Sequence, residues 1–248
     1  MSYSKDIQNA KTLDELFSIW KNKNPSDGIN HAEDLFIADG IVNPEVWNSG
    51  KKKRILFVLK EAYGDDWGDY TLATWLADKH PEKRMWNRIA RIVYGMENTS
   101  AQEICRYKPK LTSSEHAASL DQIAVMNLKK SKGKSQSNYD DIAHYALHDK
   151  DEIRREFEMI DADIVLCGST FKTLCNNVFD RELNKSEFCD NWYYNLELDG
   201  KKRLFIDFYH PANQWPDLIN YYSVMGIYQQ ALIENMKGNE MLNNRSCD

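Results

Sequence analysis

One short stretch of the sequence constrains the fold more than any other. Residues 55–59 (Ile-Leu-Phe-Val-Leu) form an unbroken apolar run that follows the basic residues 51–54. The run is too short for a typical helix and is rich in strand-forming residues, so it predicts a strand that is buried on both faces. Such strands are typical of parallel sheets that helices cover on both sides.

Similar strands are predicted at residues 121–126, 163–167 and 203–208, and helical periodicity fills much of the sequence between them. The last strand is the second arm of a predicted hairpin that turns at Asp199-Gly200. Alternation of strands and helices indicates βαβ units. We therefore expect an α/β protein with three α/β/α layers and a central, mostly parallel four-stranded sheet. It would form a single domain over residues 1–248, with an N-terminal helical extension of about residues 1–50.

Composition excludes several classes of protein. The net charge of −6 provides no global field that would attract nucleic acid or anionic membrane, although residues 51–54, 108–110 and 129–134 form local basic clusters. The five cysteines include no CxxC pair, which argues against a disulfide scaffold, a zinc ribbon and an iron–sulfur cluster. No apolar signal region or bilayer-length apolar run is present, so we expect a cytoplasmic protein without a membrane partner.

Polar side chains follow each predicted strand. Glu61, with Asp65 nearby, follows the first strand, and Asn127, Ser169 and His210 follow the others. The carboxyl ends of parallel strands lie at one edge of the sheet, where open α/β sheets bind ligands. Taken alone, the first of these segments fits a solvated acidic loop equally well. The presence of polar residues after all four strands favours a site.

The order and content of these segments resemble the uracil-DNA glycosylase superfamily. The resemblance rests on residues 55–64, 123–130, 163–174 and 205–213. Phe-Val-Leu-Lys-Glu-Ala-Tyr-Gly resembles the water-activating loop, which carries a glutamate at this position in the thermostable bacterial and archaeal branch. The chain departs from that loop where Lys60 replaces the usual glycine and Tyr63 the usual proline. Because the cluster-binding cysteines of that branch have no counterpart near the N-terminus, no iron–sulfur cluster and no other cofactor is expected.

The resemblance implies a role for each segment. Glu61 would position or activate water, with Asp65 as its substitute, and Asn127 would read an edge of the base. His210, in Phe-Tyr-His-Pro-Ala-Asn, would stabilise the negative charge on the departing base. Ser169 and the start of the following helix would hold a phosphate. The base would stack on Tyr63, Trp67 and Tyr70, and the DNA backbone would be held by Lys129, Lys130, Lys132, Lys134 and Asn213.

Structural alternatives exist for these residues. Asn127 fits a turn cap, Ser169 an ordinary helix N-cap, and His210 a histidine that hydrogen-bonds a loop. His144 and His148 have the i, i+4 spacing of a metal pair, but without a nearby acidic signature we favour a surface pair and no metal. The basic, serine-rich residues 128–138 predict a mobile loop.

These expectations favour a monomeric DNA glycosylase of DNA repair, which would hydrolyse the N-glycosidic bond of a flipped base, most simply uracil. Two alternatives remain open. One is a catalytically inactive module that binds nucleic acid or nucleotides on the same fold. The other is a hydrolase of another small nucleoside-like substrate, for which DNA binding would be weak.

Overall fold

The computed structural model describes residues 3–63, 71–134, 136–181 and 192–245. Within these ranges six strands form one mixed sheet in the order β1-β3-β2-β4-β6-β5. The four central strands are parallel, and β1 and β5 pair antiparallel at the two edges. The strands are β1 Gly40–Ile41, β2 Ile55–Glu61, β3 Ile123–Lys129, β4 Ile164–Gly168, β5 Tyr193–Leu198 and β6 Lys201–Phe208.

The predicted mostly parallel α/β sheet is thus confirmed, and it is wider than the four strands expected. The hairpin is also confirmed, because β5 and β6 pair across Asp199 and Gly200, which adopt φ values of 52° and 74°. Positive φ at both turn positions is what the type I′ turn, one of the two common two-residue hairpin loops, requires. The prediction that Asn127 ends its strand is wrong, since β3 continues for two more residues to Lys129.

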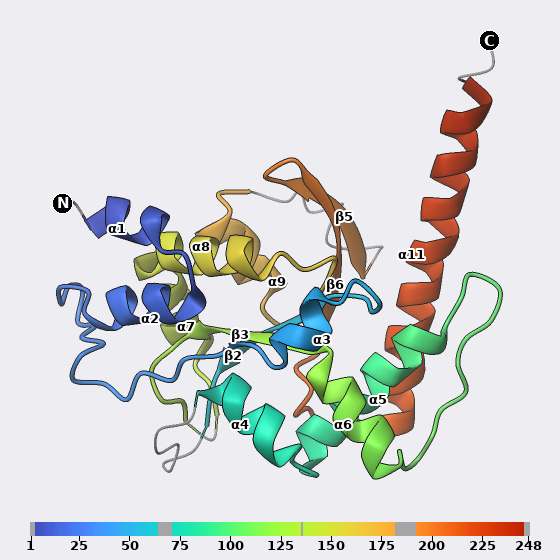
Figure 1. Cartoon of the computed structure of the whole chain (residues 1–248), viewed down its shortest axis with the longest axis horizontal. Coiled ribbons are helices and arrows are strands. Elements are labelled where there is room, and N and C mark those ends of the chain that lie inside the picture. Colours follow the sequence, from blue (N-terminus) through green and yellow to red (C-terminus); the bar gives the residue numbers. More distant parts are fainter. Residues whose placement is uncertain (1–2, 64–70, 135, 182–191, 246–248) are drawn as a thin grey trace.

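Helices cover both faces of the sheet (Figure 1). On one face lie α4 Leu72–Lys79, α5 Arg84–Asn98, α6 Ser113–Asp121 and α11 Asp217–Arg245. On the other face lie α2 Leu13–Lys21, α3 Pro44–Asn48, α7 Tyr139–His148, α8 Lys150–Ile160, α9 Phe171–Thr173 and the π-helical turn η1 Leu174–Val178. The short helix α1 Tyr3–Asn9 packs outside α2 and α8. Successive side chains of a strand point to opposite faces, so each strand contributes to the apolar cores on both sides of the sheet. Phe57 and Leu59 pack in the first core, and Leu56 and Val58 pack in the second.

The connections create a switch point at β2 and β4. The chain passes from β2 outward to β3, and then crosses back to place β4 on the other side of β2. The connections leaving neighbouring strands therefore run in opposite directions, which opens a crevice at their carboxyl ends. In doubly wound α/β proteins, ligands bind at this point.

The N-terminal segment is part of the main core rather than only a helical extension. Phe17 and Trp20 of α2 are buried in the second core, and β1 extends the sheet by pairing with β3. Residues 31–39 contain no helix. There the chain instead makes an isolated bridge between Phe36 and Ser131.

A buried ionic cluster joins this segment to the sheet. Lys130 Nζ lies 2.5 Å from Asp39 Oδ1 and 2.7 Å from Glu156 Oε2, and all three side chains are fully buried. Asp39 Oδ2 accepts hydrogen bonds from the backbone N–H of Asn127, at 2.7 Å, and from its side-chain amide, at 3.0 Å. We call Asp39, Asn127, Lys130 and Glu156 the buried cluster.

Burial raises the pKa of Glu156 well above its ordinary value, and Lys130 opposes that rise only in part. Burial alone would lower the pKa of Lys130, but the carboxylates of Asp39 and Glu156 raise it above its ordinary value. The cluster therefore pairs the Lys130 ammonium directly with Asp39, while burial favours the protonated form of Glu156.

The contacts of residues 130–133 correct two predictions. Lys130 does not reach the surface, so it cannot contact a DNA phosphate. The loop predicted as mobile is held over its first half, because Ile37 N–H donates to the Lys130 carbonyl and Gly133 N–H donates to the Ala62 carbonyl. Across the described residues, no helix has the length and apolar character needed to cross a membrane.

We predict that Lys130→Met lowers the free energy of unfolding by about 3–5 kcal/mol, since it leaves the Asp39 carboxylate buried without its counter-charge. Denaturant unfolding followed by circular dichroism measures the effect. Lys134→Met, at an exposed position four residues further on, is the control and should change stability by less than about 0.5 kcal/mol. Equal effects of the two substitutions would contradict a structural role for Lys130.

Candidate functional site

Four side chains meet at the carboxyl edge beside the switch point. Lys60 lies near the end of β2, Ser169 follows β4, His210 follows β6, and Tyr139 is the first residue of α7. Lys60 Nζ lies 2.9 Å from the Tyr139 hydroxyl and 4.2 Å from the centre of its ring. Ser169 lies near enough to Tyr139 to help lower the pKa of its phenol, and Ser169 Oγ accepts a hydrogen bond from the backbone N–H of His210 at 3.1 Å. We call these four residues the carboxyl-edge cluster.

The backbone around Ser169 allows the His210-Pro211 turn to pack closely against the end of β4. A Cβ atom on Gly168 would lie 3.0 Å from Leu59 Cδ2 and 3.1 Å from Pro211 Cδ, so the glycine lets the His210-Pro211 turn pack against the end of β4. Ser169 adopts φ 60°, a left-handed conformation that is uncommon outside glycine, and its N–H donates to the Phe208 carbonyl at 2.7 Å. Strained residues of this kind gather at functional sites.

A buried arginine holds the loop that carries His210. Arg88 of α5 is 2% exposed, and it donates to the carbonyls of Pro211, Asn213 and Trp215 while it pairs with Asp217. One guanidinium thus fixes the loop at several points and does not itself face solvent. Arg88 is a supporting residue for the site.

His210 is set up as a neutral hydrogen-bond donor. The Ala212 N–H donates to His210 Nδ1 at 3.2 Å, so the proton of a neutral ring sits on Nε2. Burial, the larger cause, and the nearby Lys60 charge together lower the pKa of His210 to about 4. No described residue hydrogen-bonds Nε2, which leaves an N–H available to a ligand.

Lys60 and Tyr139 add positive character to the same edge. The hydrogen bond from Lys60 lowers the pKa of the Tyr139 phenol, although burial opposes the shift. Among the described residues, Lys60 has no carboxylate partner. The carboxyl-edge cluster therefore offers an ammonium group and hydroxyl and imidazole donors, a combination that suits an anionic group.

Glu61 lies apart from this cluster. Successive residues of a strand point to opposite faces, so Lys60 and Glu61 diverge. The parallel register places Glu61 opposite Lys129, and their side chains form an ion pair at 3.3 Å, with Glu61 only 4% exposed. A Cβ atom on Gly133 would lie 2.7 Å from Glu61 Cδ, which shows how closely the following loop covers this carboxylate.

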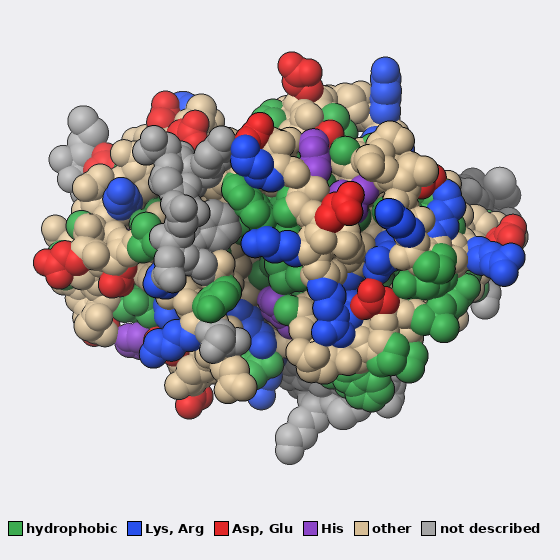
Figure 2. Space-filling model, turned by 90° about the horizontal axis from the view of Figure 1, so that it is seen from below, with side chains coloured by type: hydrophobic (Ala, Val, Ile, Leu, Met, Phe, Trp, Pro, Cys, Tyr) green, Lys and Arg blue, Asp and Glu red, His purple; other side chains and the backbone are tan. Residues whose placement is uncertain are grey.

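The remaining predicted residues fall into five groups. Asn127 is 1% exposed and bonded to Asp39, so the prediction that it reads a base is corrected by its burial. Asn213 lies in the His210 loop, where its side chain donates to the His210 carbonyl at 2.9 Å. Near the edge, three predicted residues are exposed: Tyr63, Lys132 and Lys134. Lys129 is largely buried in its ion pairs with Glu61 and Asp141. Outside the described residues lie Asp65, Trp67 and Tyr70. Figure 2 shows a face where Lys and Arg side chains border a hollow that also contains hydrophobic and His side chains.

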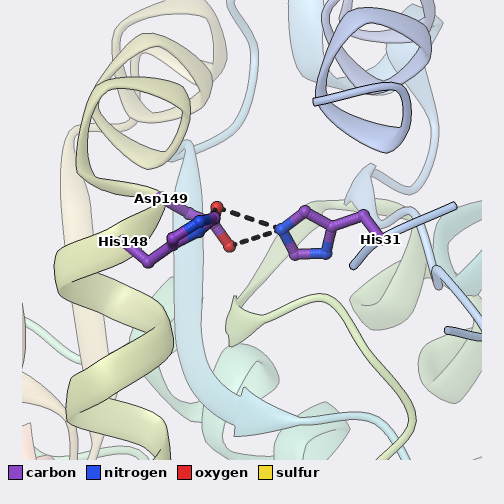
Figure 3. Close-up of side chains that lie close together, drawn as sticks. All are labelled: His31, His148 and Asp149. Carbon is purple, nitrogen blue, oxygen red and sulfur yellow. Dashed lines mark hydrogen bonds and ion pairs between the residues drawn. The ribbon is translucent and has the colours of Figure 1, made fainter. Parts of the chain in front are cut away.

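A second polar group lies away from the carboxyl edge, where the side chains of His31 and His148 point at Asp149 (Figure 3). His31 Nε2 lies 2.9 Å from Asp149 Oδ2, and His148 Nδ1 lies 2.6 Å from Oδ1. The His148 side chain is only 4% exposed, so the prediction of a surface pair with His144 is wrong for this histidine. His144 is exposed and hydrogen-bonds the Asp27 carbonyl.

These three residues could hold a metal by their chemistry, but their surroundings favour a structural role. Lys23 Nζ lies 3.1 Å from Asp149 Oδ1 and 2.8 Å from Glu152 Oε1, so an ammonium group already supplies the positive charge. The nitrogen–oxygen distances are those of hydrogen bonds. Burial would raise the pKa of Asp149, but the hydrogen bonds and charges of His31, Lys23 and His148 lower it below its ordinary value. The group ties the segment after α2 to the start of α8.

Sequence reasoning missed Lys60, Tyr139 and Arg88 as parts of the site. In the sequence Lys60 stands out only as a departure from the family pattern, and Tyr139 lies 79 residues further along the chain. The hydrophobic pattern of α5 gave no sign that Arg88 turns inward. Only the fold brings these residues to one edge.

Comparison with known proteins adds no family assignment: no protein-family model matches the chain, and no curated protein matches it.

We predict that His210 stays neutral with its proton on Nε2 until the pH falls to about 4. Nitrogen NMR of the labelled imidazole measures both the tautomer and the pKa. Lys60→Met should raise this pKa because it removes a neighbouring like charge, whereas Lys202→Met at the opposite end of β6 should not. Because the folded pKa lies below the unfolded one, the charge on His210 costs stability as the pH falls from about 6.5 to about 4. A pKa near 6.5 would show that His210 is solvated instead.

We predict that Asp149→Asn lowers the free energy of unfolding by about 3 kcal/mol, because Lys23 then loses a buried partner. Asp180→Asn, which removes an exposed ion pair with Lys150, should cost less than about 1 kcal/mol. Excess Zn²⁺ should leave the thermal midpoint of the wild type unchanged. A midpoint that rises with Zn²⁺ in the wild type, and not in Asp149→Asn, would instead identify a metal site.

Proposed function

We propose that this protein binds nucleic acid or nucleotides through a phosphate at the carboxyl-edge cluster, as a binding module on a uracil-DNA glycosylase-like fold. The observation that carries the proposal is the Lys60 ammonium at the switch point, which is held by Tyr139 and has no carboxylate partner among the described residues. Ser169, in its left-handed turn, and the Nε2–H of His210 add donors beside it.

Two features favour binding over hydrolysis. The Glu61 carboxylate, which would activate water, is covered and paired with Lys129. Asn127, which would read the base, is buried and bonded to Asp39. A base-hydrolysing site needs both functions to face the ligand. The described residues do not present either of them in that way.

A DNA glycosylase is the second candidate, and the state of His210 favours it. A neutral imidazole with a fixed N–H donor is suited to stabilising the anion of a departing base. Uracil release from single- and double-stranded DNA tests this candidate. Release by the wild type that is lost in His210→Ala would replace the binding module with an enzyme.

We predict that Lys60→Ala weakens binding of a fluorescein-labelled oligonucleotide by about tenfold and reduces the slope of log K against log salt by about 1, because one phosphate contact is lost. Fluorescence anisotropy over a salt series measures both quantities. Lys202→Ala, an exposed lysine at the amino end of β6, is the matched control and should change neither. Equal binding by the wild type and Lys60→Ala would contradict the proposal.

A further inference from the structure

An aromatic groove lies beside the segment that leads into His210. It has a volume of about 520 Å³ and runs between the end of β6, the start of β5 and α11. Its main lining residues are Trp192, Phe208, Tyr209, Trp215, Ile219 and Tyr222. Tyr209 directly precedes His210, so the groove and the proposed phosphate site share one segment of the chain.

The rings in this groove are unusually open to solvent. Trp192 and Tyr209 are each 45% exposed, Trp215 is 53% exposed and Tyr222 is 41% exposed. Several large aromatic side chains that are exposed together mark an interaction surface on a soluble protein. Most of them are aromatic rather than aliphatic, so the surface suits a partner that presents flat rings.

The rings form a connected platform. Tyr209 and Trp215 are nearly parallel, with an interplanar angle of 19° and ring centres 6.1 Å apart. Trp192 lies beside Tyr209, with the ring centres 5.6 Å apart and the two planes tilted by 49°. Offset, nearly parallel rings leave faces on which further planar groups can stack.

The platform is held in place rather than frayed. The Trp215 carbonyl accepts hydrogen bonds from Arg88 at 3.0 Å and from Asn220 at 3.1 Å, and the Trp215 N–H donates to Asn213 Oδ1 at 2.9 Å. Arg88 thus fixes both the His210 loop and the backbone of Trp215. Exposure of a ring on a fixed backbone reduces the entropy lost when a ligand stacks on it.

Charge at the rim fits a phosphate backbone. Arg84 is exposed beside the groove, where its guanidinium hydrogen-bonds Gln214 and the Trp215 carbonyl. No carboxylate is among the lining residues of the groove that the structure describes. Bases would stack on the groove while their phosphates pass Arg84 and Lys60.

We propose that the groove binds the unpaired bases of single-stranded nucleic acid, and that this strand continues into the carboxyl-edge cluster. The inference rests on the proposed function, because Lys60 supplies the phosphate contact. Duplex DNA is disfavoured because its bases are already stacked on one another and present no free faces. Stacking tolerates every base, so little sequence preference is expected.

The test compares a fluorescein-labelled dT oligonucleotide, an abasic oligonucleotide of the same length and a blunt duplex by fluorescence anisotropy. Trp215→Ala and Tyr209→Ala should each weaken dT binding by roughly 5- to 100-fold and leave abasic binding nearly unchanged, because only the bases stack. Leu147→Ala, an exposed apolar residue on α7, is the control. Circular dichroism and the thermal midpoint confirm that each variant folds.

The outcomes separate this inference from the proposed function. If Lys60→Ala weakens dT binding while both aromatic variants bind like the wild type, the groove is not the base site but the phosphate site stands. If the wild type binds none of the three nucleic acids, both proposals fail. Self-association of the wild type that Trp215→Ala abolishes, without oligonucleotide binding, would make the groove a contact between copies of this chain and would overturn the inference.

Discussion

The buried pair of Lys130 and Asp39 is the interaction on which the rest of the structure depends. A charged lysine at 0% exposure is costly unless its counter-charge lies within hydrogen-bond distance. Asp39 comes from the segment before β1, Lys130 follows β3, and Glu156 belongs to α8. The requirement to pair these charges therefore joins the N-terminal segment, the sheet and one helical layer in a single arrangement.

That arrangement also fixes the geometry of the carboxyl edge. The Asp39 carboxylate accepts hydrogen bonds from the backbone and side-chain N–H groups of Asn127, which holds β3 in register. This register places Lys129 opposite Glu61. Once Glu61 is paired, the alternation of β2 leaves Lys60 to face Tyr139 on the other side. The composition of the site is thus a consequence of how β3 is anchored.

The sequence predicted the sheet well and the site only in part, for different physical reasons. Apolar runs such as residues 55–59 and the Asp199-Gly200 turn are local signals, and the strands and hairpin they predicted are present. The fate of Asn127 and Lys130 depends on Asp39, about 90 residues away, and no local pattern reports such pairing. From composition alone, the basic, serine-rich residues 128–138 are expected to be solvated. That expectation changes only when the buried Asp39 carboxylate is seen to pair with Lys130.

The electrostatics of the edge argue for recognition of an anion more than for attack by water. Lys60 and the donors Ser169 and His210 provide positive potential, while the nearest described carboxylate in sequence, Glu61, is neutralised by Lys129. A water nucleophile needs a base that is free to take its proton, and a base locked in an ion pair gives up that capacity. The same neutral His210 that would assist a leaving group also serves as a simple donor to a bound phosphate. The carboxyl-edge cluster therefore suits phosphate binding in its present arrangement, whereas hydrolysis would require Glu61 to leave its ion pair with Lys129.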